Sequence, residues 1–140
     1  MVDRGVAARR LATLRDAAAR ARAMIPASAD EFVANRTARE VVALNLLVAI
    51  QVALDLASHW IADAGWGVPQ TYGDLFRLLG ERGVLPQPLA ERLRGAAGLR
   101  NLIAHQYGEI DWRRVYSETA GDLDDLEQFA AAIAAAMDAT

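Results

Sequence analysis

The residue types that could carry out chemistry gather in one short segment, residues 100–107, which contains Arg100, Asn101, His105 and Tyr107. An arginine and a histidine beside one phosphodiester suffice for metal-free cleavage of RNA. A neutral imidazole can take the proton of the 2′-hydroxyl, or an imidazolium can protonate the leaving oxygen, while the guanidinium fork stabilises the extra charge on phosphorus. Spacing alone fits a structural alternative better, in which Arg100 pairs with an acid and His105 caps a helix C-terminus.

These two candidate catalytic residues do not start on the same face of a helix. Residues four apart share a face, so Asn101 aligns with His105. Arg100, by contrast, begins about 140° away from His105, at roughly 100° per residue. The helix is expected to end between His105 and Gly108, and unwinding of its last turn would narrow that angle. Asn101 would then orient His105 or contact the sugar-phosphate backbone, unless it is simply a helix-terminal residue.

A polar stripe interrupts an otherwise apolar stretch upstream, where Gln51, Asp55 and His59 follow one another at intervals of four. Buried polar groups need partners. Two interpretations of Asp55 remain open: it faces the catalytic cleft and holds Arg100, or it only fixes the register of helix packing. His59 is expected to be a structural histidine. The three tryptophans, Trp60, Trp66 and Trp112, are expected to anchor packing or an interface.

The composition excludes several kinds of chemistry. There is no cysteine, which rules out disulfides, thiolate metal sites and a cysteine nucleophile, and only two histidines are present. A histidine-rich metal site is therefore unavailable, although carboxylates could still bind a hard cation. We expect no metal site and no cofactor. All fifteen basic residues are arginine, which reflects either a GC-rich genome or a need for bidentate phosphate binding. The net charge of −3 has the wrong sign for general phosphate attraction, so any nucleic-acid contact must use a local patch.

Charge is distributed unevenly along the chain. Residues 1–26 hold six arginines and two aspartates, a net charge of +4, whereas residues 109–140 hold eight acids and two arginines, a net charge of −6. The simplest interpretation is two solvated helix faces, although such asymmetry can also position partners. The longest apolar stretch, residues 41–60, is broken by Asn45, Gln51, Asp55 and Ser58, which favours a buried helix over a membrane span. With no signal peptide recognised, we expect a cytoplasmic protein without a membrane anchor.

Local signals predict five helices and no strand, an all-α up-and-down bundle that forms a single domain over residues 1–140. Proline ends the first helix, Ser28 or Asp30 caps the second, Thr71 caps the third and Asp111 caps the fifth. Paired prolines open the fourth helix, and Gly83 ends the third. The predicted ranges are 3–25, 30–63, 72–83, 88–105 (extending at most to 108) and 112–137.

The pattern Arg-x-x-x-x-His-x-Tyr, with asparagine after the arginine, resembles the signature of HepT-like toxins of the HEPN ribonuclease superfamily. The resemblance extends over residues 35–130. Residues 50–59 look like the family's second helix, residues 72–76 look like its third, and Asp111 with the closing acidic helix also fits.

This resemblance implies a HEPN-like helical domain that acts as a two-fold homodimer. Its activity would be metal-independent endoribonuclease cleavage of RNA, as the toxin of a toxin–antitoxin pair. Arg100 and His105 would be catalytic, supported by Asn101 and Asp55, and a dimer cleft would supply two Arg–His pairs. The partner would be a nucleotidyltransferase antitoxin, which neutralises the toxin by adding AMP to Tyr107.

Alternatives remain at the level of the sequence. Tyr107 could instead stack a base, bind phosphate or pack the helix end. The whole chain could be a non-catalytic nucleotide- or RNA-binding helical module that partners a nucleotidyltransferase, or a purely structural interaction protein. The acidic net charge favours these last two functions, whereas the complete set of Arg100, Asn101, His105 and Tyr107 favours the nuclease.

Overall fold

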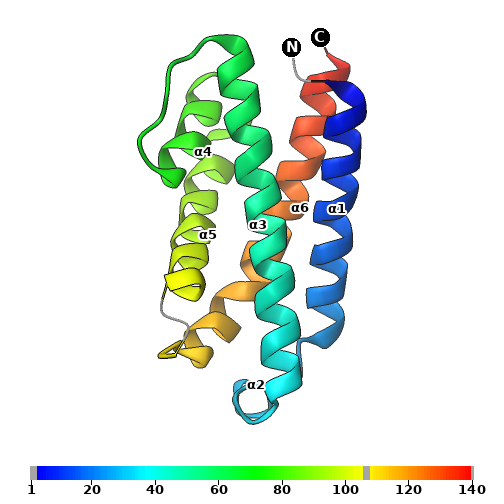
Figure 1. Ribbon diagram of the computed structural model, residues 1–140, viewed down its shortest axis with the longest axis vertical. Coiled ribbons are helices and arrows are strands. Elements are labelled where there is room, and N and C mark those ends of the chain that lie inside the picture. Colours follow the sequence, from blue (N-terminus) through cyan, green and yellow to red (C-terminus); the bar gives the residue numbers. More distant parts are fainter. Residues whose placement is uncertain (1–2, 106–107, 140) are drawn as a thin grey trace.

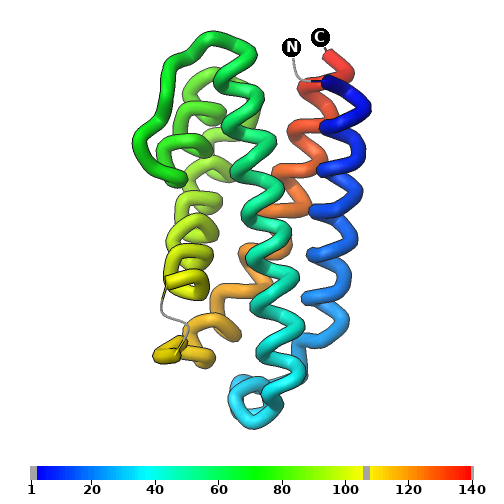
Figure 2. The backbone as a smooth tube through the Cα atoms, viewed as in Figure 1, coloured from blue at the N-terminus to red at the C-terminus, as the bar shows by residue number. Residues whose placement is uncertain are grey.

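The computed structural model describes residues 3–105 and 108–139, and these form six α-helices and no strand (Figure 1). The helices are α1 (Arg4–Met24), α2 (Ala29–Ala34), α3 (Arg36–Ala64), α4 (Tyr72–Glu81), α5 (Gln87–His105) and α6 (Trp112–Asp138). The four long helices α1, α3, α5 and α6 alternate in direction, so that α1 begins and α6 ends at the same end of the molecule (Figure 2). The predicted all-α, up-and-down arrangement is confirmed.

The predicted number of five helices is wrong, because the second one is divided at Asn35. The backbone of Asn35 is extended, with φ −105° and ψ 96°, and its side chain accepts a hydrogen bond from the Ala38 amide at 3.0 Å. Asn35 is therefore the N-cap of α3. The short α2 has its own cap, Ser28, whose hydroxyl accepts from the Glu31 amide at 3.2 Å.

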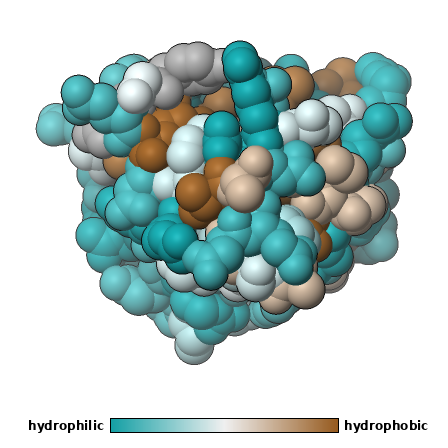
Figure 3. All heavy atoms as spheres, turned by 90° about the horizontal axis from the view of Figure 1, so that it is seen from below, coloured by the Kyte–Doolittle hydropathy of each residue, from teal (hydrophilic) through white to brown (hydrophobic). Residues whose placement is uncertain are grey.

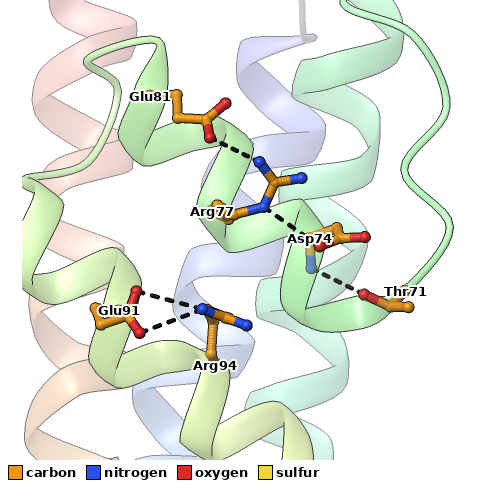
Figure 4. Close-up of polar contacts among 6 residues, drawn as sticks. All are labelled: Thr71, Asp74, Arg77, Glu81, Glu91 and Arg94. Atoms are coloured by element: carbon orange, nitrogen blue, oxygen red, sulfur yellow. Dashed lines mark hydrogen bonds and ion pairs between the residues drawn. The ribbon is translucent and has the colours of Figure 1, made fainter.

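The other helix ends lie within a few residues of their predicted positions. Thr71 caps α4 by accepting from the Asp74 amide at 3.2 Å, and Asp111 caps α6 in the same way. Gly83 follows α4 with a φ of 77°, a conformation that favours glycine. Figure 4 shows the exposed side of α4, where Arg77 lies between Asp74 and Glu81.

One hydrophobic core connects all six helices. Phe76 of α4 packs edge-to-face on Phe129 of α6, with ring centroids 5.8 Å apart. The approach of α4 to α5 is close at Gly80, where an added Cβ would lie 2.7 Å from the Cβ of Ala90. Glycine at this position therefore allows the close packing of α4 on α5.

Part of the uneven charge along the chain is neutralised by ion pairs between helices. The basic α1 packs beside the acidic α6, and Arg22 donates to Asp124 at 2.6 Å and to Glu127 at 3.2 Å. Arg92 of α5 donates to Asp125 of α6 at 2.8 Å. The interpretation as two solvated helix faces is therefore incomplete. The exposed pairs of Arg22 contribute little to stability, whereas Asp125 is buried.

Helix α3 leaves part of an apolar surface uncovered. It runs along the front of the bundle, with α4 and α5 on one side and α1 on the other (Figure 1). By length and composition α3 is apolar enough to cross a membrane, but half of its most apolar stretch is buried inside the bundle. On the uncovered side Leu44 is 62% exposed, and Val48 and Val52 are partly exposed.

Candidate active site

Arg100 lies where α5 meets α3 and the start of α4, and three neighbours hold its guanidinium. Its Nη2 donates to Oε1 of Gln51 at 3.2 Å, and its Nη1 donates to Oδ1 of Asn101 at 3.1 Å. Its Cζ lies 4.9 Å from the centroid of the Tyr72 ring, a cation–π contact. Arg100 is half-buried, and it forms no ion pair with any acid in the described part of the chain. The structural alternative for Arg100, a salt bridge with an acid, is therefore wrong among the described residues.

Gln51 is in turn held by Asp55, one helical turn further along α3. The Nε2 of Gln51 donates to Oδ1 of Asp55 at 3.1 Å. The other carboxylate oxygen, Oδ2, accepts from Nη1 of Arg10 on α1 at 3.3 Å. A polar chain of four residues, Arg10–Asp55–Gln51–Arg100, thus crosses α3 from α1 to α5.

Of the two interpretations of Asp55, direct contact with Arg100 is wrong, whereas a role in fixing the register of helix packing stays a prediction. Asp55 does not contact Arg100 directly, but reaches it through Gln51. Sequence reasoning noted Gln51 only as part of the polar stripe, and missed Arg10. The interval of four between Gln51 and Asp55 indicated their contact, whereas nothing local indicated that Arg10 would face them.

His105 is the last residue of α5 and is exposed. Since α5 continues unbroken from Gln87 to His105, the expected unwinding before Gly108 does not occur up to His105. Arg100 and His105 therefore keep an angular separation of about 140°, and a rise of about 7.5 Å along the helix axis. Within one chain the two side chains leave α5 in different directions.

Asn101 accepts a hydrogen bond from Arg100 and so helps to hold the guanidinium. Tyr107, the predicted modification site, lies outside the described residues. Figure 3 views the end of the bundle at which α5 finishes, and there hydrophobic groups are interspersed among hydrophilic side chains.

An open groove of about 490 Å³ adjoins Arg100. It is lined by Ser58, Val68, Pro69, Gln70, Thr71, Tyr72, Leu75 and Asn101. Two of these, Tyr72 and Asn101, are also direct neighbours of Arg100. A flat group could be accommodated against the apolar side chains while the hydroxyls and amides hydrogen-bond its edges.

His59 lies outside this site. It is exposed and borders a second hollow of about 220 Å³ between α1 and α3, together with Asp3, Arg10 and Asp63. Among the described residues no cluster of three or more histidine, aspartate or glutamate side chains could hold a metal ion.

The strongest electrostatic perturbation is at Asp122 on α6, whereas the described polar and ring contacts of Arg100 are with α3, α4 and α5. Burial raises the pKa of Asp122 from 3.8 to about 7, assisted by the nearby charges of Glu118 and Asp125. Its Oδ2 atom is buried without a hydrogen-bond partner among the described residues. This carboxyl therefore affects stability, and it is distinct from the site around Arg100.

The all-helical bundle, with Arg100 and His105 on one helix, defines a protein of the HEPN type. The chain belongs to the ribonuclease HepT-like family, whose model matches residues 14–133. The solved structure of a tri-AMPylated Shewanella oneidensis HEPN toxin in complex with an MNT antitoxin has a similar fold. It aligns with a TM-score of 0.83 and 30% sequence identity, over 96% of this chain and 99% of that chain.

Two curated relatives are nucleases. The mRNA nuclease HepT of Shewanella oneidensis is 33% identical over 99 residues, which make up 71% of this chain and 74% of that protein. The tRNA nuclease HepT of Aphanizomenon flos-aquae is 27% identical over 89 residues, which make up 64% of this chain and 60% of that protein. The family resemblance drawn from the sequence is confirmed.

Proposed function

We propose that this protein is a metal-independent endoribonuclease, the toxin of a toxin–antitoxin pair, with Arg100 and His105 as its catalytic residues. The observation that carries the proposal is the environment of Arg100, which is oriented by the uncharged acceptors of Gln51 and Asn101. A guanidinium that is held in place without being neutralised can still bind a phosphate with its full charge.

The proposed reaction needs one proton to leave and one to arrive. The 2′-oxygen of a ribose attacks the adjacent phosphorus while His105 takes the proton of the 2′-hydroxyl. The bond from phosphorus to the leaving 5′-oxygen breaks, and a protonated imidazole supplies a proton to that oxygen. Arg100 stabilises the charge that develops on the phosphate oxygens.

A homodimer would supply both proton transfers, since one histidine does not easily perform them at once. Leu44, Val48, Gln51 and Asp55 follow one another at intervals of four, three and four, so they share one face of α3. The apolar half of this face is uncovered, which suits a self-complementary contact with a second copy. A two-fold axis along that face would bring two copies of the Gln51–Arg100 contact together, and with them two Arg100–His105 pairs.

The substrate would be RNA, with one base in the groove beside Tyr72. The groove has both an apolar wall and polar edges, which are the properties that recognise a single unpaired base. The relatives include an mRNA nuclease and a tRNA nuclease, and both of these names point to RNA as the substrate class. The protein would act on this RNA in the cytoplasm.

The proposed partner is a nucleotidyltransferase antitoxin that transfers AMP to Tyr107. The support is the solved relative, which is a tri-AMPylated toxin in complex with an MNT antitoxin. An AMP group on Tyr107 would add bulk and negative charge, and we propose that it competes with the RNA backbone.

The test is incubation of the purified protein with total RNA in the presence of EDTA. Cleavage by the wild type, together with its loss in both Arg100→Ala and His105→Ala, is the expected result. Loss of wild-type cleavage on chelation, with recovery on adding a divalent cation, would contradict the metal-free mechanism.

A non-catalytic nucleotide- or RNA-binding module that partners a nucleotidyltransferase is the second candidate. Two observations favour it: the net charge of −3, and the separate directions in which Arg100 and His105 leave α5. The same incubation distinguishes it, because such a module would bind RNA and leave it intact.

A further inference from the structure

We propose that Gln51 is the positioning residue for Arg100, and that Asp55 and Arg10 act through it by fixing which end of its amide faces the arginine. This inference rests on the proposed catalytic role of Arg100. The Gln51 amide hydrogen-bonds both to the carboxylate of Asp55 and to the guanidinium of Arg100, and it keeps these two groups from pairing directly.

The orientation of the amide follows from its two neighbours. An ionised carboxylate only accepts hydrogen bonds, and a guanidinium only donates them. Asp55 must therefore face the NH2 end of Gln51, and Arg100 must face its carbonyl, as the distances of 3.1 Å and 3.2 Å indicate. Turning the amide over would set donor against donor on one side and acceptor against acceptor on the other.

The link also keeps the negative charge of Asp55 away from Arg100. That charge pairs with Arg10, whose Nη1 lies 3.3 Å from Oδ2 of Asp55. A carboxylate placed directly on Arg100 would form a charge-assisted pair and compete with an RNA phosphate for the same fork. The neutral carbonyl of Gln51 orients the guanidinium of Arg100 in the same direction through a weaker hydrogen bond. The remaining donors of Arg100 therefore stay available to the substrate.

The face of the guanidinium is fixed separately. The Tyr72 ring lies 4.9 Å from the Cζ of Arg100, whereas the carbonyls of Gln51 and Asn101 accept from its two terminal nitrogens. Arg100 is thus held before any substrate arrives, which is what electrostatic stabilisation of a transition state requires.

The decisive substitution is Gln51→Glu, which keeps the size of the side chain and puts a carboxylate on Arg100. We expect the single-turnover rate of RNA cleavage to fall by about 100-fold, the scale of losing one positioned donor. The new carboxylate also faces Asp55 in place of the amide NH2 group, so circular dichroism must show that the variant is folded. The matched control is Gln128→Glu, because Gln128 accepts from Arg92 at 3.3 Å in a similar Arg–Gln contact between α5 and α6. That variant should cleave RNA at the wild-type rate.

A charge swap separates positioning from simple structural support. The double variant Arg10→Asp with Asp55→Arg can re-form the ion pair between α1 and α3. It also places the guanidinium of the new arginine at position 55 beside Gln51. The Gln51 amide must then turn its carbonyl towards that guanidinium and its NH2 group towards Arg100. We expect the swap to regain the thermal stability that Asp55→Ala loses, while its cleavage rate stays at least about tenfold below the wild type.

The outcomes distinguish this inference from the proposed function. If the wild type does not cleave RNA, or Arg100→Ala cleaves as fast as the wild type, the proposed function fails. If Arg100→Ala is inactive but Gln51→Glu cleaves at the wild-type rate, the positioning role of Gln51 is overturned and the nuclease assignment stands. Should the charge swap not fold, by circular dichroism, the comparison of Gln51→Glu with Gln128→Glu decides alone.

Discussion

Gln51 and Arg100 meet across two helices with 3.2 Å between Oε1 and Nη2, although they are 49 positions apart in the chain. The acceptor is an amide carbonyl, so the arginine is oriented without an ion pair to any acid in the part of the chain that the structure describes. The proposed chemistry depends on this contact. It should also depend on the planar shape of the guanidinium.

Arg100→Lys should not restore the activity lost in Arg100→Ala. A lysine ammonium is a point charge and cannot reach Gln51, Asn101 and a phosphate in the fixed geometry of the fork. We expect the lysine variant to cleave RNA at least about 100-fold more slowly than the wild type, measured in single-turnover reactions. A rate within a few-fold of the wild type would mean that positive charge alone is sufficient.

Leu44→Glu should dissociate the proposed homodimer, because it places a charge on the exposed apolar face of α3. Light scattering at micromolar concentration should show a dimer for the wild type and a monomer for the variant, with activity lost alongside. Mixed dimers of the wild type with His105→Ala hold one His105 and should cleave far more slowly than the wild-type dimer, because two imidazoles are needed for the two proton transfers. A wild-type monomer, or mixed dimers that cleave at the wild-type rate, would contradict a composite site.

Tyr72→Ala should weaken RNA binding, since the ring borders the groove and carries the contact with Arg100. Loss of one base-stacking ring corresponds to a rise in KM of about tenfold. Tyr72→Phe keeps the ring and should retain the wild-type KM. Equal KM values for the wild type and the alanine variant would remove the groove from the substrate-binding surface.

Tyr107→Phe should leave cleavage largely intact and make the protein resistant to the proposed antitoxin. The phenol oxygen is the proposed acceptor of AMP, and phenylalanine lacks it. After co-expression with the nucleotidyltransferase, intact-mass spectrometry should show added AMP on the wild type and none on the variant. The same added mass on both proteins would move the modification to another residue.

Asp122→Asn should stabilise the fold in a pH-dependent way. The folded pKa of about 7 lies above the unfolded value of 3.8, so the folded protein holds a proton that the unfolded chain releases. Stability is therefore complete below about pH 4 and decreases as the pH rises to about 7. Relative to the wild type, the asparagine variant should gain about 1 kcal/mol or more at pH 8 and nothing near pH 4.

Thermal unfolding at the two pH values measures this difference. A gain that is the same at pH 4 and pH 8 would show that Asp122 is not the group responsible. Arg77→Gln is a suitable control, because Arg77 lies on an exposed side of α4 and its described ion pairs are with Asp74 and Glu81 of the same helix.

The sequence by itself determined the helical class and most helix ends. Caps and stops such as Thr71, Gly83 and Asp111 depend on a few contiguous residues, and this local chemistry is visible without a fold. The break at Asn35 was missed because the helical pattern on both sides is continuous. The turn at Asn35 positions Phe32, whose ring packs 6.0 Å from Trp112 and 5.6 Å from Tyr116 of α6, a contact that only the folded chain contains.

The candidate site likewise has some features that the sequence indicated and others that only the fold decided. Residues 100–105 could be singled out from their order along one helix, together with the family to which that order points. Only the tertiary structure decided that Gln51 holds Arg100 and that Arg10 faces Asp55. These partners lie 45 or more positions apart, and their meeting depends on how α1, α3 and α5 rotate to bury their apolar faces, which is a property of the whole core.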